Sequence, residues 1–327
     1  MELQPVNKTD LQSFQNIEQV ISESSSENFM QANTMPVNMI DLKEGCIIPS
    51  FAKDLESTIS HSEFIETVNE VAYRLFDRET ILNPAIRVSH PINGRIPEAM
   101  GKPAKELLDH EKTLYYERVA FIIEIPSIFD TVHGNTLSLT IGGVRAYNLE
   151  NLYSKKTEEK FKVFIGFKNH VCTNLCVSTD GFLGELKVRT TDEMAKKVWE
   201  LFTAYRYEKK VLDFSALGEL TISEHQFAQI IGKMRLYQYL PLADKKEIEP
   251  APLNDSHVAT IARDYYSNKS FCRDDDGSIN LWRLYNLFTS SNKSSYIDTF
   301  LDRGVGCSQF LEMLREALLK GSNCWYL

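Results

Sequence analysis

The residues of this chain that are best suited to chemistry gather in one segment, FKVFIGFKNHVCTNLCV (residues 161–177). Large apolar residues fill most of its odd positions, and its even positions carry Lys162, Phe164, Gly166, Lys168, His170, Cys172, Asn174 and Cys176. This alternation predicts a β-strand, because successive side chains of a strand point to opposite faces. We therefore expect one face to enter a core while the other presents lysine, histidine and thiol groups.

The segment is longer than an ordinary strand of about 3–10 residues. We expect a break near Gly166 or at Lys168–Asn169, which divides the polar face in two. The half from Lys162 to Lys168 is the candidate for an external contact. The half from His170 to Cys176 is interpreted as a packed, hydrogen-bonded interior row.

His170, Cys172 and Cys176 are residue types that bind zinc. On a continuous strand that rises ~3.3 Å per residue, the two cysteines lie roughly 13 Å apart, whereas two thiolates on one zinc ion lie within about 4 Å of each other. They can share an ion only if Thr173–Leu175 turns. We therefore assign no metal and no cofactor, keep His170 and Cys172 as the metal candidates, and interpret the cysteines as small hydrophobes beneath a helix.

The same residues define an alternative function, a metal- or thiol-dependent enzyme in which His170 and Lys168 activate Cys172. Side chains two positions apart on a strand are ~6.6 Å apart, which is beyond hydrogen-bond reach. The sequence also contains no GxSxG motif, no HExxH motif and no phosphate-binding loop. The favoured interpretation is a protein that is not an enzyme.

The run RDDDGSIN (residues 273–280) resembles a calcium-binding loop. When Gly277 is aligned with the turn glycine, Cys272 falls on the first ligand position and Arg283 on that of the bidentate glutamate. Because neither residue suits calcium, the sequence predicts a turn that caps the following helix.

Nucleic-acid contact fits the basic residues best. Lys162, Phe164 and Lys168 place cations beside an aromatic ring, as on surfaces where bases stack and phosphates are neutralised. Neighbouring predicted strands add Arg145, Lys187 and Arg189. Residues 142–210 carry 13 Lys and Arg against 9 Asp and Glu in a chain of net charge −9, so a local contact is expected rather than strong non-specific affinity. The alternative is a solvated sheet face on which lysines prevent edge pairing.

Helical and strand patterns follow one another in blocks. Residues 1–38 are rich in Ser, Gln, Asn and Glu and predict a disordered tail. A capping box at Ser60 and Glu63 begins a helix over about 61–77, and short segments rich in Val, Ile, Thr and Phe then predict a mostly antiparallel sheet over about 85–190. The remaining helices are expected around 103–111, from 192 onwards, from 224 after a second capping box at Ser223 and Gln226, and at 255–267, 279–290, 294–302 and 307–320.

This order predicts an α+β fold, with a central antiparallel sheet, helices before it and a helical C-terminal third. Three regions are expected: the tail 1–38, an α+β core 39–242 and a helical region 243–327, which either packs on the core as one domain or stands apart. No basic segment followed by an apolar run opens the sequence, and no stretch approaches 18 apolar residues, so we expect a cytoplasmic protein without a membrane partner. The six cysteines are expected to be reduced.

The C-terminal aromatic residues offer a further alternative, a protein–protein interaction module. Helical spacing favours a buried stripe over an exposed binding face for this set, which comprises Trp282, Tyr285, Phe288, Tyr296 and Phe300.

Several stretches are similar to a known family: CIIPSFAKD (46–54), IRVSHPINGRIP (86–97), LSLTIGGVRAYNLENLY (137–153), FKVFIGFKNHVCTNLCVSTDG (161–181) and INLWRLYNLFTSSNKSSYIDTFLDR (279–303). They resemble a bacterial domain-of-unknown-function family carried on phage-like and conjugative mobile elements. VCTN (171–174) and LYNLFT (284–289) are distantly similar to the broader group of phage- and plasmid-like proteins.

The resemblance implies an accessory protein of mobile DNA, for which binding or annealing nucleic acid is a common task. It identifies no catalytic residue. The leading hypothesis is a non-enzymatic protein that contacts single-stranded nucleic acid or a nucleoprotein partner through the face bearing Lys162, Phe164 and Lys168. The sequence predicts no oligomeric state.

Overall fold

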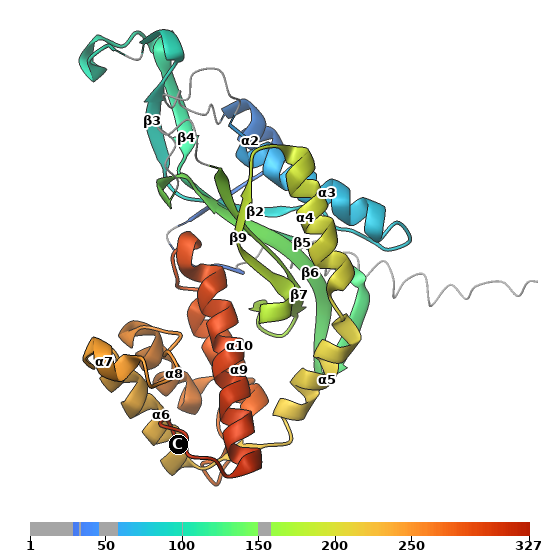
Figure 1. Ribbon diagram of the computed structural model, residues 1–327, viewed down its shortest axis with the longest axis vertical. Coiled ribbons are helices and arrows are strands. Elements are labelled where there is room, and N and C mark those ends of the chain that lie inside the picture. Colours follow the sequence, from blue (N-terminus) through green and yellow to red (C-terminus); the bar gives the residue numbers. More distant parts are fainter. Residues whose placement is uncertain (1–28, 33, 46–57, 100, 150–157) are drawn as a thin grey trace, which may run out of the picture.

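The computed structural model of the chain describes residues 29–32, 34–45, 58–99, 101–149 and 158–327. Its centre is one curled antiparallel sheet of seven strands, and the fold is α+β as the sequence predicts (Figure 1). The strands are β1 (Met35–Val37), β2 (Ala85–Val88), β5 (Arg118–Val132), β6 (Asn135–Ala146), β7 (Glu159–Asn169), β8 (Asn174–Cys176) and β9 (Phe182–Val188). Their order is β1-β2-β5-β6-β7-β8, and β9 pairs with the first residues of β7 while β8 pairs with its last.

The break expected in the segment 161–177 lies after Asn169. Strand β7 ends there, the chain turns over residues 170–173, and β8 returns antiparallel to β7. Thr173 takes a left-handed backbone conformation, with φ of +56°, to complete this turn. The alternating segment is therefore a hairpin rather than one long strand.

Helices cover the sheet and form the end of the chain. They are α2 (Met39–Gly45), α3 (His61–Leu75), α4 (Thr191–Ala204), α5 (Tyr207–Leu217), α6 (Glu224–Tyr237), α7 (Leu242–Lys245), α8 (Asp255–Ser267), α9 (Leu281–Asn292) and α10 (Ile297–Lys320). Both predicted capping boxes form, at the starts of α3 and α6. A side chain that accepts from the helix backbone in this way satisfies amide groups that a helix start leaves free.

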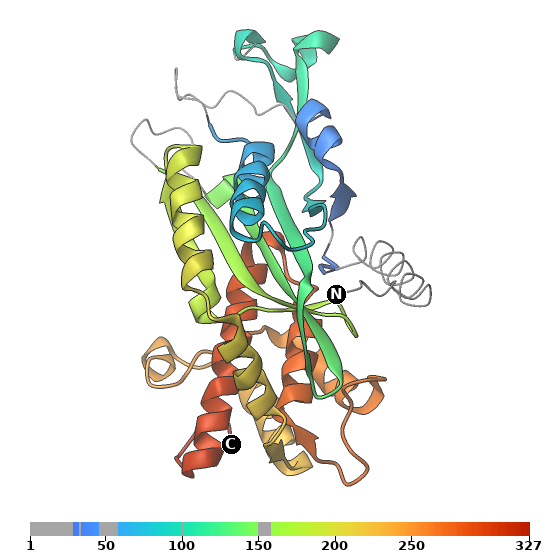
Figure 2. The ribbon, with the colours of Figure 1, turned by 90° about the vertical axis from the view of Figure 1, so that its right-hand side faces the viewer.

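From Val163 to Asn169 both faces of β7 are buried. Its odd residues, such as Val163 and Ile165, belong to the core under α3 and α4, whereas Phe164 packs with Phe300 and Leu301 of α10 (Figures 1 and 2). The alternation in the sequence correctly separates the two faces. It does not show that a helix more than a hundred residues later covers the second one.

Three expectations about elements are corrected by the structure. In place of a helix around 103–111 there are two short 3-10 turns, at Ala104–Glu106 and Asp109–Glu111. The helices expected at 294–302 and 307–320 are one helix, α10, which continues through Gly304-Val305-Gly306. The third correction concerns the predicted tail 1–38: Phe29 packs near Phe300 and β1 pairs with β2, so the described residues from 29 to 38 belong to the folded structure, whereas residues 1–28 and 33 lie outside the described residues.

A separate hairpin projects from the sheet and forms an arm at the end of the molecule (Figures 1 and 2). Its strands are β3 (Pro91–Arg95) and β4 (Lys112–Tyr116), which pair antiparallel. A third, two-residue ladder joins β10 (Thr221–Ile222) to β11 (Ile279–Asn280).

The helical C-terminal region shares its core with the sheet. One cluster of buried apolar side chains extends from Leu42 to Tyr326, and α9 is buried along almost its whole length. The five cysteines among the described residues are free thiols, and Cys46 lies outside them. No helix in the described ranges combines the length and apolar character needed to span a bilayer.

Candidate functional site

The polar end of β7 forms a buried network around Glu124 of β5. Lys168 Nζ lies 2.8 Å from Glu124 Oε2, and both side chains are almost fully buried. On the other carboxylate oxygen, Ser138 Oγ donates at 2.7 Å and His170 Nε2 lies at 3.0 Å. Burial by itself would raise the pKa of Glu124, but the hydrogen bond with His170, the charge and hydrogen bond of Lys168 and the Ser138 hydroxyl together lower it to about 2. The carboxylate is thus ionised in the folded protein.

This network is not arranged as a proton relay. His170 contacts Ser138 and Glu124 through the same ring nitrogen, Nε2, whereas a nucleophile–base–carboxylate triad uses both nitrogens of the ring. The Ser138 hydroxyl is also fully buried. The geometry suits a structural crosslink between β5, β6 and β7.

Cys172 and its neighbours are tied to α9. Asn286 of α9 accepts from the Asn169 amide at 2.9 Å and from the Cys172 thiol at 3.7 Å, and its main-chain oxygen accepts from Asn174 at 3.0 Å. Burial raises the pKa of Cys172 to about 11, so the thiol is the dominant form at neutral pH, and a thiol is a poor nucleophile.

His170 and Cys172 do not form a metal site with their surroundings. Within the described residues, no group of three or more His, Cys, Asp or Glu side chains is placed to hold an ion. Cys176 is buried in β8, and burial raises the pKa of its thiol as well. The half from His170 to Cys176 lies mostly in the interior, packed on α9.

The predicted nucleic-acid residues divide into two groups. Arg145, Phe164 and Lys168 are buried: Arg145 pairs with Glu159 and lies between the rings of Tyr147 and Phe161, on the face of the sheet opposite Lys162. Phe164 and Lys168 are covered because α9 and α10 occupy the face that the alternation left open. These three residues therefore offer no surface for a base or phosphate.

The other group lies together where β7 and β9 pair. Lys160 and Lys187 are directly opposite each other in the antiparallel register, and Lys162 is the next residue along β7 on the same face. Arg189 comes directly after the last residue of β9, two positions beyond Lys187, and its side chain is 68 % exposed. We call Lys160, Lys162, Lys187 and Arg189 the lysine edge.

Carboxylates near the lysine edge neutralise the positive charge of some of its residues but not of all of them. Lys187 Nζ is 3.1 Å from Glu185, Lys162 pairs with Asp302 of α10, and Arg189 is 3.9 Å from Glu158. Lys160 is exposed and has no ion pair with any residue that the structure describes. The hydrogen bond and charge of Lys187, with the charges of Lys160 and Lys162, lower the pKa of Glu185.

A shallow hollow and an exposed ring adjoin the lysine edge. Lys160, Lys162 and Asp298 line a hollow of about 270 Å³. Lys162 Nζ donates to the main-chain oxygen of Asp298 at 2.7 Å, and Tyr296, two residues before it, is 69 % exposed. The other four members of the C-terminal aromatic set are buried, so the core interpretation holds for them and not for Tyr296.

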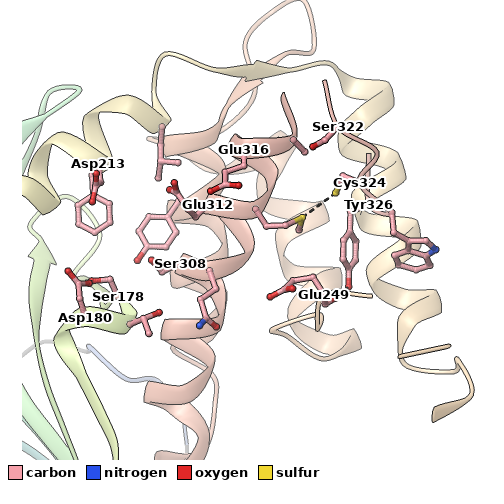
Figure 3. A pocket seen from close by; sticks show the side chains of 18 of the residues that line it. Ser178, Asp180, Asp213, Glu249, Ser308, Glu312, Glu316, Ser322, Cys324 and Tyr326 are labelled. Carbon is pink, nitrogen blue, oxygen red and sulfur yellow. Dashed lines mark hydrogen bonds between the residues drawn. The ribbon is translucent and has the colours of Figure 1, made fainter. Parts of the chain in front are cut away.

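A larger hollow than the one beside the lysine edge lies elsewhere, between α5, α10, the segment after α7 and the C-terminal residues. It encloses about 970 Å³, and carboxylates from several elements face it (Figure 3). These carboxylates belong to Asp180, Asp213, Glu247, Glu249, Glu312 and Glu316, against the two cations Lys209 and Lys210.

Lys210 already neutralises part of this acidic cleft. Its ammonium lies 3.2 Å from both Asp180 and Asp213. The remaining carboxylates and the rings of Trp325 and Tyr326 suit an ammonium or guanidinium group rather than an anion. Sequence reasoning missed this cleft, although Ser308, Glu312 and Glu316 recur every four residues and mark a polar face of α10.

Comparison with known proteins gives a family without an assigned reaction. No curated protein matches the chain, and no solved structure matches it. The family model described as "Domain of unknown function, B. Theta Gene description (DUF3871)" matches residues 11–327. The chain therefore belongs to the DUF3871 family of domains of unknown function.

Proposed function

We propose that this chain is a non-enzymatic accessory protein of mobile DNA elements that binds single-stranded nucleic acid at the lysine edge. The observation that carries the proposal is the cross-strand pair of Lys160 and Lys187. Like charges directly opposite each other destabilise a β-ladder, and an anion between them removes that cost.

The spacing of the lysine edge suits a phosphate backbone. Lys160 and Lys162 are two positions apart on β7, roughly 6.6 Å, and Lys187 and Arg189 are two positions apart at the end of the partner strand β9. Successive phosphates of an extended single strand lie at a comparable separation. The ion pairs of Lys187 and Arg189 are largely exposed, and exposed pairs contribute only about 0–1 kcal/mol, so phosphates can replace their carboxylates.

Tyr296 supplies the stacking surface that the sequence had assigned to Phe164. Its ring is exposed beside the segment that holds Lys162, and base stacking on an aromatic side chain contributes about 1–3 kcal/mol. The resemblance to proteins of mobile elements supports the choice of nucleic acid as the anion.

The test is fluorescence anisotropy with a labelled 20-nucleotide single strand at low salt. We expect Lys160→Glu/Lys187→Glu to weaken binding about tenfold or more, and the logarithm of the wild-type association constant to fall with the logarithm of salt concentration with a slope of about −2 to −3. The matched control is Lys196→Glu/Lys197→Glu, which makes the same charge change at exposed positions on α4.

Two results would contradict the proposal. One is a wild-type protein that leaves the anisotropy of the single strand unchanged at low salt. The other is an equal loss of binding in the α4 control, which would assign the effect to net charge rather than to the lysine edge.

A further inference from the structure

Two helix–loop–helix units stand side by side in the C-terminal half. The first is α5–β10–α6 and the second is α8–β11–α9, and their loops are joined by the antiparallel pairing of β10 with β11. In this ladder Ile222 lies opposite Ile279. Both isoleucine side chains are completely buried.

The two units share one local frame. Ile222 is followed by Ser223, whose side chain caps α6 by accepting from the amide of Gln226. Ile279 is followed by Asn280, whose side chain caps α9 by accepting from the amide of Arg283 at 2.8 Å. In both units a buried isoleucine is followed by the capping residue, and the cap accepts from the amide of the residue three positions after it.

This frame is that of a calcium-type helix–loop–helix. In such a loop of twelve residues the sixth is a glycine at a sharp turn, and the twelfth, near the start of the second helix, is a bidentate glutamate. Counting from Cys272, the sixth residue is Gly277, which has a left-handed φ of +84°, and the twelfth is Arg283. Asp274 and Asp276 fall on the third and fifth positions, which are ligand positions.

Arg283 directs its positive charge at the residues that would face the ion. Its Nη1 donates to the carboxylate of Asp274 and lies 3.4 Å from the main-chain oxygen of Cys272. The loop residues and Arg283 line a concave space of about 630 Å³. Asp276 turns instead to Ser278, accepting from its amide at 2.9 Å and its hydroxyl at 2.7 Å.

We infer that residues 272–283 form a calcium-type loop in which the guanidinium of Arg283 takes the place of the ion. A built-in cation holds α8 and α9 in one arrangement at any calcium concentration. The loop then serves as a fixed joint under the C-terminal helices and not as a calcium sensor.

The experiment restores the ion position in the full chain with Cys272→Asp/Arg283→Glu. We expect the melting temperature of this variant to be several degrees higher in 5 mM calcium chloride than in EGTA, and that of the wild type to be the same in both. The matched control adds Asp274→Asn and Asp276→Asn to the double variant, and it should lose the response to calcium.

A second pair of variants keeps the inference testable if the double variant folds poorly. Arg283→Gln should lower the melting temperature in EGTA, and Asp274→Asn/Arg283→Gln should recover part of that loss because no carboxylate is left unpaired. The inference is overturned by a wild-type protein whose melting temperature rises with calcium. It is equally overturned by a folded double variant without a calcium response, or by no recovery in the Asp274→Asn/Arg283→Gln pair.

Discussion

The carboxylate of Glu124 is the group that Lys168, Ser138 and His170 all contact in the buried network at the end of β7. Replacing it by Gln leaves the Lys168 ammonium unpaired in the interior, and breaking one side of a buried pair costs about 3 kcal/mol or more. We therefore expect Glu124→Gln to lose about 3 kcal/mol of unfolding free energy at pH 7, measured by urea denaturation. Glu124→Gln/Lys168→Met, which removes both charges, should recover much of that loss, and a double variant as unstable as the single one would contradict this.

Glu124 also makes the stability of the protein depend on pH in the acid range, and the sign of this dependence can be predicted. The pKa of Glu124 is lowered from 4.5 to about 2 in the folded state. As the pH falls through 4.5 the unfolded chain takes up a proton that the folded chain does not, so this part of the stability is present above pH 4.5 and is lost between pH 4.5 and about 2. Urea denaturation at a series of pH values should show a shallower acid decline for Glu124→Gln/Lys168→Met than for the wild type, and parallel declines would contradict the assignment.

Residue patterns predicted the chemistry of the candidate site only in part. The alternation from Phe161 to Val177 correctly placed Lys162 and Phe164 on one face of a strand, and the break after Asn169 followed from strand length. It could not reveal that α10 buries Phe164, because burial depends on a contact between residues far apart in sequence. The end of β7 where β9 pairs with it, at Lys160 and Lys162, is accessible, and His170 at the other end of the strand is partly exposed.

At the scale of elements, α10 is the clearest departure from the sequence prediction. The sequence predicted two helices, 294–302 and 307–320, with a gap that contains Gly304 and Gly306, yet α10 continues through both glycines. A methyl group added at Gly304 would lie 3.6 Å from the Asn292 amide, an ordinary contact, whereas one at Gly306 would lie 3.1 Å from Pro252. Capping boxes were reliable by comparison, since they are local and need no distant partner.

These contacts predict different effects on stability for two similar substitutions. Gly304→Ala should raise the unfolding free energy by roughly 0.5–1 kcal/mol, because alanine favours a helix interior over glycine. Gly306→Ala should gain less or lose stability, because Pro252 must move. Thermal denaturation of both variants tests this, and a destabilised Gly304→Ala would be evidence that the helix is broken there.

At the scale of the whole molecule, the sheet and the C-terminal helices share their apolar cores. Phe164, Ile122 and Val144 on the sheet meet Phe300 and Leu301 of α10, and α9 is enclosed between other elements. The order of elements along the sequence predicted the α+β class. It left open whether the region after residue 242 packs on the core, because packing depends on surfaces and not on element order.

A division at the predicted boundary tests this packing. Without residues 243–327 the sheet would expose the apolar side chains that α10 covers, and large exposed apolar patches favour aggregation. We expect a fragment of residues 1–242 to be insoluble or to bind a hydrophobic dye when produced alone. Co-expression with residues 243–327 should yield a soluble complex, whereas a monomeric 1–242 fragment with a sharp melting transition would contradict this expectation.

The arm formed by β3 and β4 has a practical consequence for such experiments. Its strands pair only with each other within the part of the chain that the structure describes, and a substituent at Gly101 would meet no neighbouring atom within 4 Å. A fluorophore or surface anchor attached at the end of the arm is therefore held away from the sheet, the lysine edge and the C-terminal helices. The arm offers a point from which the intact protein can be tethered and observed while its other surfaces stay free.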